Sequence, residues 1–121
     1  MKEDWCNTTN VNPRGAYQLM SVALRAAGRP IFHSMCEWGD NQPWRWARDI
    51  GHSWRIGPDI WCSFDSTRVF PKYIQCSVTD CVNRTDTLRQ YAGRGHWNDP
   101  DMLECGNGMT NNEDRAHFAM W

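Results

Sequence analysis

The stretch from Ile31 to Asp40 reads IFHSMCEWGD and joins a short apolar run to a polar loop. Its mostly apolar first part, residues 31–36, is typical of a strand that is buried on both faces of a parallel sheet. A helix is predicted just before it, over residues 12–28, because Asn12 can cap the start and Pro13 suits the first helical position. A helix, a strand and a polar loop in this order predict a β/α repeat with functional residues in the loop.

The rest of the chain repeats this pattern. We expect a short helical piece over residues 43–50 and a strand end at 52–55. An irregular helical connection is expected over residues 69–92, followed by another strand end at 96–98. A last helix is expected over residues 110–121, where Thr110 and Glu113 form a capping box at its start. Successive β/α units predict an α/β fold with parallel strands, whose carboxyl ends gather at one edge of the sheet.

The composition of the chain fits one small domain of 121 residues. A formal net charge of -1 gives no reason to expect nucleic acid or an anionic membrane as a partner. No apolar stretch approaches the ~20 residues that a membrane-spanning helix needs, and the start of the chain has no signal-peptide pattern. The eight tryptophans are many for this length, so we expect about half in the core and others at a sugar-binding site.

The six cysteines are irregularly spaced. They lack the paired spacing with histidines that zinc sites show, so we expect no metal. Cys76 and Cys81 are close enough in sequence to form a local disulfide. This cysteine content indicates an oxidising compartment, although only weakly. Two segments, Asn7-Thr8-Thr9 and Asn83-Arg84-Thr85, match the N-glycosylation acceptor pattern.

Two aspartates lie close to tryptophans: Asp4 precedes Trp5, and Asp59 follows Trp54 by five residues. Two positioned carboxylates are the minimum equipment for cleaving a glycosidic bond, since one attacks or activates water while the other protonates the leaving oxygen. Each aspartate taken alone is better explained as a helix cap or a turn residue. Further acidic residues, Glu37 and Asp101, follow other predicted strands, so four carboxylates are expected at one edge.

Four segments together resemble the melibiase-type α-galactosidases of glycoside hydrolase family 27. They are KEDWCN at residues 2–7, CEWG at 36–39, SWR with a following aspartate at 53–59, and GHWNDPDM at 95–102. The segments occur in the family's order. The catalytic domain of that family is a (β/α)8 barrel, which takes ~250 residues.

The resemblance therefore implies a partial barrel that spans residues 1–121, from about the end of strand four to helix seven. We therefore expect this chain to need the remaining strands and helices of the barrel as its partner. The resemblance also implies a carbohydrate substrate, no cofactor, and a secreted, periplasmic or lysosomal-type location for the full-length protein.

Residue by residue, Asp4 matches the nucleophile of the family and Asp59 matches its general acid/base. The matching substrate-binding positions are Lys2, Glu37, Trp38, Arg55 and Asp101. Lys2 lies two residues before Asp4, so on a strand it points to the same side and favours the ionised carboxylate. A structural salt bridge is the alternative explanation for Arg55. Cys6 matches a cysteine whose family partner lies upstream.

The chain departs from the family pattern in three places. Arg94 replaces a usual proline, Cys105 replaces an aliphatic residue, and Asp40-Asn41 fits neither of the pairs that distinguish galactose from N-acetylgalactosamine. The implied activity is that of a retaining α-galactosidase. The alternatives are an α-N-acetylgalactosaminidase, a β-L-arabinopyranosidase or an isomaltose-releasing enzyme of the same family, or a non-catalytic fragment.

Overall fold

The computed structural model describes residues 1–71 and 73–121 of the chain. Four short parallel strands form one sheet in the order β1-β2-β3-β6. They span Lys2–Asp4 (β1), Ser34–Cys36 (β2), Ser53–Arg55 (β3) and Trp97–Asp99 (β6). The expected α/β arrangement with parallel strands is confirmed, and β1 and β6 are the two edge strands.

Helix α1 spans Pro13–Ala26 and lies within the range expected from the sequence. The Asn12 side chain accepts a hydrogen bond from the Gly15 backbone N–H, which satisfies one free donor of the first turn. The helix buries Tyr17 against the sheet residues Met35 and Trp54. Four of the eight tryptophans pack in or against this core, as expected: Trp5, Trp44, Trp46 and Trp54.

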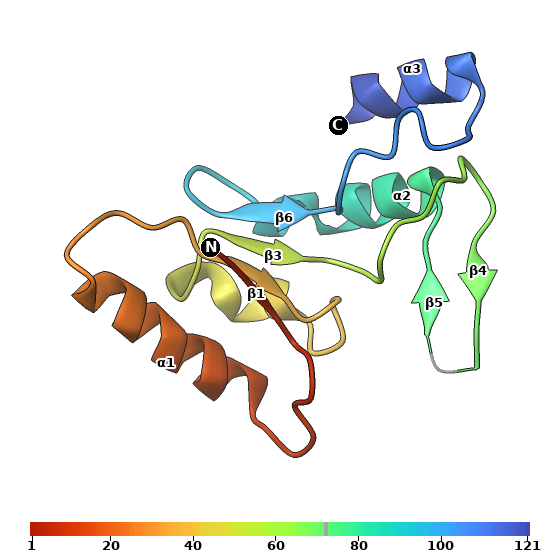
Figure 1. Cartoon of the computed structure of the whole chain (residues 1–121). Coiled ribbons are helices and arrows are strands. Elements are labelled where there is room, and N and C mark those ends of the chain that lie inside the picture. The colour runs from red at the N-terminus through yellow and green to blue at the C-terminus, as the bar shows by residue number, and fades with distance from the viewer. Residues whose placement is uncertain (72) are drawn as a thin grey trace.

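The other helical elements follow the predicted order. Short 3-10 turns span Pro43–Arg45 (η1), Ala47–Asp49 (η2) and Arg89–Tyr91 (η3), while longer helices span Val78–Leu88 (α2) and Asn111–Met120 (α3). The expected capping box of Thr110 and Glu113 is present at α3. Figure 1 shows α1 and α3 at opposite ends of the molecule. No helix of the described residues is long and apolar enough to cross a membrane.

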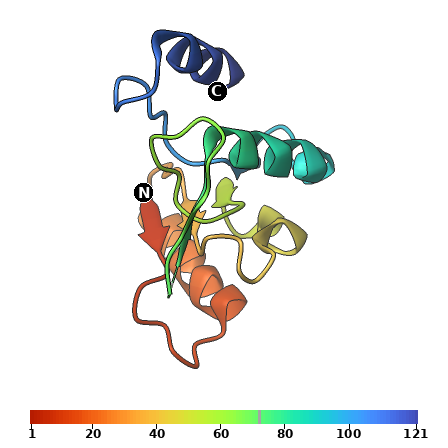
Figure 2. The ribbon, with the colours of Figure 1, turned by 90° about the vertical axis from the view of Figure 1, so that its right-hand side faces the viewer.

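The expectation of a helical connection over residues 69–92 is wrong for its first part. Strands β4 (Arg68–Val69) and β5 (Ile74–Gln75) form an antiparallel hairpin there. Pro71 interrupts any helix at this point, and the surrounding β-branched and aromatic residues favour extended backbone. The hairpin lies on the side toward which the strands of the sheet point (Figure 1), and the side view shows it crossing in front of the sheet (Figure 2).

All six cysteines are free thiols in this structure, so the local disulfide expected between Cys76 and Cys81 is not formed. The two thiols nevertheless influence each other. The Cys81 thiol lowers the pKa of Cys76 to about 7, while Cys76 and burial raise the pKa of Cys81.

Candidate active site

The carboxyl ends of the parallel strands bring the predicted site residues to one edge of the sheet. Asp4 is the last residue of β1, and Glu37 directly follows β2. Arg55 is the last residue of β3, with Asp59 four positions further on. Asp101 follows β6 by two residues. The edge therefore gathers four acidic residues and one arginine.

Arg55 is the centre of this group. Its guanidinium is almost fully buried and its Nη2 atom lies 3.0 Å from Asp59 Oδ1 and 2.8 Å from Asp101 Oδ2. Burial works against the charge, but the carboxylates outweigh it and raise the pKa of Arg55. The Asp101 side chain is also buried and accepts a second hydrogen bond from the Ile60 backbone N–H at 2.8 Å. Arg55 thus ties the loops after β3 and β6 together.

Cys36 links Arg55 to the other predicted catalytic residue. Arg55 Nη1 donates to the Cys36 sulfur at 3.7 Å, and Cys36 is the neighbour of Asp4 in the sheet register. Burial is the main reason why the pKa of Cys36 rises to about 12, and the nearby Asp4 carboxylate adds to the rise. The neutral thiol therefore lies between Asp4 and the Arg55–Asp59 pair.

Lys2 and Asp4 form an ion pair at 3.4 Å between Nζ and Oδ1. Both side chains are about half exposed, so the pair contributes little to stability. The alternation of side chains along a strand placed Lys2 and Asp4 on the same side, as the sequence predicted.

Glu37 lies apart from the Arg55 network. Its side chain is fully buried, and its Oε2 accepts hydrogen bonds from the backbone N–H and the side-chain amide of Asn41 at 2.8 and 2.7 Å. Among the described residues, its Oε1 is buried with no hydrogen-bond partner. Burial raises the pKa of Glu37, although the bonds from Asn41 oppose this effect.

Two predicted site residues have left-handed backbone, Trp38 with φ 56° and Asp101 with φ 85°. Neither is a glycine, so both conformations are strained, and such strain is concentrated at functional sites. Next to Trp38, Gly39 also has a positive φ, of 80°. A Cβ atom at Gly39 would lie 2.7 Å from the Ile56 carbonyl oxygen, so the loop after β2 touches the end of β3.

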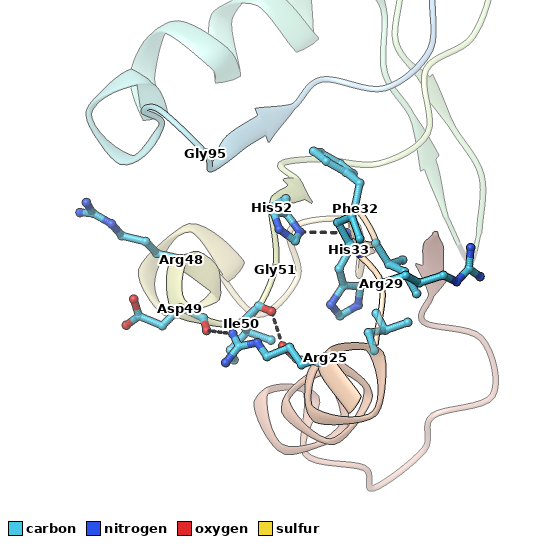
Figure 3. Close-up of a pocket in the computed structure, with 14 residues that line it drawn as sticks. Arg25, Arg29, Phe32, His33, Arg48, Asp49, Ile50, Gly51, His52 and Gly95 are labelled. Atoms are coloured by element: carbon cyan, nitrogen blue, oxygen red, sulfur yellow. Dashed lines mark hydrogen bonds between the residues drawn. The ribbon is translucent and has the colours of Figure 1, made fainter. Parts of the chain in front are cut away.

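A cavity of about 590 Å³ lies at the opposite edge of the sheet, between α1 and η2. Its lining includes Arg25, Arg48 and His52, and Figure 3 shows Arg25 hydrogen-bonded to the Asp49 backbone carbonyl oxygen beside it. None of the predicted site residues lines it. It opens at the amino ends of the strands, which in parallel β/α folds contribute to stability rather than catalysis.

Sequence reasoning did not identify the bridging position of Cys36 or the contact between Asn41 and Glu37. A signal for Cys36 was available, since strand register sets it beside Asp4 once two parallel strands are assumed. In the described part of the chain, no group of three or more His, Cys, Asp and Glu side chains could hold a metal ion.

Solved structures define the class of fold. The chain superposes on α-galactosidase from Saccharomyces cerevisiae with a TM-score of 0.88 and 34% identity, over 99% of this chain and 30% of that one. It also superposes on α-galactosidase I from Mortierella vinacea with a TM-score of 0.86 and 36% identity, over 97% and 33% of the two chains. The sheet and its helices are therefore a partial β/α barrel of the glycoside hydrolase type.

The family follows from sequence comparison. Residues 1–121 match the family described as "Alpha galactosidase A", and the chain belongs to that family. It is 50% identical over 121 residues to "Alpha-galactosidase A" of Cellvibrio japonicus and 43% identical over 122 residues to a "Probable alpha-galactosidase" of Dictyostelium discoideum. It spans about 30% of the length of these relatives.

Proposed function

We propose that this chain forms part of the active centre of a retaining exo-glycosidase that hydrolyses terminal α-D-galactosyl residues of oligosaccharides or glycoconjugates. One observation carries the proposal. At the carboxyl edge of the sheet, Arg55 is paired with Asp59 at 3.0 Å and also donates to the sulfur of Cys36, which is the neighbour of Asp4 in the strand register. The names of its relatives support the same activity.

Asp4 and Asp59 divide the reaction between them. The Asp4 carboxylate attacks the anomeric carbon while the glycosidic C–O bond breaks and protonated Asp59 gives its proton to the leaving oxygen. Water then attacks the same carbon, Asp59 takes a proton from it, and the bond to Asp4 breaks. The sugar leaves with its original anomeric configuration. This mechanism predicts a separation of roughly 5–5.5 Å between the two carboxyl groups.

The remaining site residues have binding roles in this proposal. Lys2 is ion-paired with Asp4, and Arg55 holds Asp59 and Asp101 in place. Lys2, Asp101 and Glu37 bind hydroxyl groups of the galactosyl ring, and Trp38 forms part of its apolar wall.

The test requires a complete barrel, which we define as the Cellvibrio japonicus relative with its matching segment replaced by these 121 residues. Asp4→Ala and Asp59→Ala are each assayed with an activated α-galactoside and azide. Asp4→Ala should give the β-configured glycosyl azide, because azide replaces the missing nucleophile. Asp59→Ala should give the α-configured azide, because the covalent intermediate still forms and azide then attacks it.

Opposite anomers would mean that the two roles are reversed, and azide rescue of neither variant would refute the assignment. The unsubstituted complete barrel should prefer nitrophenyl α-galactoside over the corresponding α-N-acetylgalactosaminide and β-L-arabinopyranoside. A preference for the α-N-acetylgalactosaminide or the β-L-arabinopyranoside would instead support the corresponding alternative activity of the family.

A further inference from the structure

The cavity at the amino edge of the sheet carries a surplus of positive charge (Figure 3). Its lining includes three arginines, Arg25, Arg29 and Arg48, and a single acidic residue, Asp49. Among the residues that the structure describes, none of these arginines forms an ion pair. Three guanidinium charges against one carboxylate leave a surplus of two positive charges around a space of about 590 Å³. A doubly charged anion would match this surplus.

Two histidines in the lining add a hydrogen-bond donor rather than further charge. His33 is buried, and its Nε2 atom lies 2.7 Å from Glu3 Oε2, so Glu3 compensates any charge on this ring. His52 is exposed, and its Nδ1 atom accepts a hydrogen bond from the His33 backbone N–H at 3.0 Å. The neutral His52 ring therefore carries its proton on Nε2, where it can donate to a ligand.

Hydrogen bonds between helix α1 and the segment that leads into β3 fix the walls of the cavity. The buried Ser21 hydroxyl donates to the Ile50 carbonyl oxygen at 2.6 Å. One turn further along the helix, Arg25 Nη2 donates to the Asp49 carbonyl oxygen at 2.9 Å. These two bonds join the two sides of the cavity and hold the Arg25 guanidinium in place.

The other two arginines are free to reorient. Figure 3 shows Arg48 and Arg29 on opposite sides of the cavity, with Arg25 between them. Both side chains are exposed, and neither is held by a carboxylate of the described residues. Each can therefore turn onto an anion that enters the cavity. The planar fork of an arginine suits the oxygens of a phosphate group, which it binds through two parallel hydrogen bonds.

An aromatic face lies beside these charges. The rings of Phe32 and His52 stack with their centroids 5.1 Å apart and an interplanar angle of 26°, and both residues line the cavity. Phe32 is 53% exposed, so this stack offers apolar surface to a ligand. The volume of the cavity lies within the roughly 300–1,000 Å³ that small-molecule sites occupy. The cavity therefore combines a charged part for an anion with a flat part for a ring.

We propose that this cavity binds the phosphate monoester of a sugar. The phosphate group, with a charge of about −1.5 to −2 at pH 7, lies among the three arginines, and the sugar ring lies against Phe32 and His52. A carboxylate would compensate only half of the surplus charge, so a phosphate fits better. The site is separate from the proposed function, because it lies at the opposite edge of the sheet and contains none of the residues that we assign to hydrolysis.

Calorimetric titration of the complete barrel with glucose 6-phosphate, inorganic phosphate and uncharged glucose tests the site. Glucose 6-phosphate should bind most tightly, since it alone has both a phosphate and a ring. Arg48→Ala and Arg29→Ala should each weaken the binding of both phosphate compounds by roughly 10-fold, because each removes a charge-assisted hydrogen bond. Arg14→Ala is the matched control, since it removes the same charge at the other end of α1. It should leave both affinities unchanged, because salt screens charges that lie more than ~10 Å apart.

A second pair of variants separates the ester from free phosphate. Phe32→Ala should weaken the binding of glucose 6-phosphate alone, whereas Phe32→Tyr keeps the ring and should keep both affinities. The melting temperature of each variant without ligand checks its folding.

Three results would overturn the proposal. Binding of neither phosphate compound would show that there is no anion site. Equal losses in Arg14→Ala and Arg48→Ala would show general charge attraction instead of a site. Equal affinities for the two phosphate compounds, unchanged by Phe32→Ala, would overturn the assignment to a sugar phosphate. Hydrolysis of α-galactosides enters none of these measurements, so the site and the proposed function stand or fall separately.

Discussion

At Gly39 the loop after β2 turns with φ 80° and lies against the backbone of Ile56, the residue that follows β3. Gly39→Ala should lower the free energy of unfolding by roughly 2–5 kcal/mol, because left-handed backbone costs an L-residue roughly 1–2 kcal/mol and overpacking adds roughly 1–3 kcal/mol. Gly28→Ala is the control, since Gly28 has a similar φ of 71° and a Cβ atom added there would meet no atom within 4 Å. Urea unfolding of the complete barrel measures both, and equal losses would contradict the contact.

Glu37 predicts a dependence of stability on pH. Burial raises the pKa of its carboxyl above the usual 4.5, so the folded state binds a proton that the unfolded state releases. Below the unfolded-state pKa, Glu37 is protonated in both states and does not destabilise the fold. The destabilising effect of ionised Glu37 grows as the pH rises through the folded-state pKa. Glu37→Gln keeps an acceptor for Asn41 but cannot ionise. Its stability relative to the unsubstituted protein should therefore rise between pH 4 and 7, and melting temperatures that differ by a constant amount would refute this.

For single residues, the sequence predicted positions at the carboxyl ends of strands. The structure places Asp4 and Arg55 at the ends of β1 and β3, and Asp59 in the loop after β3. Position at the end of a strand is a local property of the chain, so a local pattern can predict it. The role of Cys36 was not found, because its contacts with Asp4 and Arg55 depend on two neighbouring strands in register. The full burial of Glu37 likewise depends on packing rather than on local pattern.

Among the elements, helix α2 and the β4–β5 hairpin share one residue, Asp80. Its carboxylate accepts hydrogen bonds from the Ser77 backbone N–H and hydroxyl at 3.0 and 2.7 Å, and from the Thr67 hydroxyl. Burial tends to raise the pKa of Asp80, but the bonds from Thr67 and Ser77 outweigh it and lower the pKa. One carboxylate therefore caps the helix and anchors the hairpin.

Asp80→Ala should lower the free energy of unfolding by about 1–2 kcal/mol at pH 7, which is the usual cost of losing a cap. Because the folded-state pKa is depressed, this contribution is present above the unfolded value and is lost as the pH falls through the folded one. The difference should thus shrink below about pH 4. Asp86→Ala is the control on the same helix, since its pair with Arg89 is more than 70% exposed on both sides and contributes only a few tenths of a kcal/mol. Urea midpoints compare the two variants, and equal effects would contradict the anchoring role.

The hairpin was the element that the sequence did not predict. We expected residues 69–92 to be helical throughout. In the structure the helix begins only at Val78, after the capping box formed by Ser77 and Asp80. The apolar residues on both sides of Pro71 are a hairpin signal. The pairing of strands only two residues long is weak in itself, so the anchors on Trp61, whose ring lies under the Arg68 guanidinium, and on Asp80 decide it, and they come from other parts of the chain.

As a whole molecule, the chain exposes β1 and β6 as sheet edges, and such edges pair readily with other strands. The 121 residues alone should show no α-galactosidase turnover, since they span about 30% of the length of their relatives. They should also form dimers or aggregates, which size-exclusion chromatography with light scattering detects. A monomer that melts cooperatively and hydrolyses an α-galactoside would show that these strands suffice.

The base of the hairpin is bonded to the loop that carries Asp59, because the Cys76 backbone N–H donates to the Asp59 carbonyl oxygen at 2.8 Å. For the acid/base role that we propose for Asp59, this bond has an evolutionary consequence. A hairpin of different length or sequence should also shift the backbone that positions the Asp59 carboxyl. Changes in the hairpin and changes at Asp59 would therefore be coupled as such a sequence diverges.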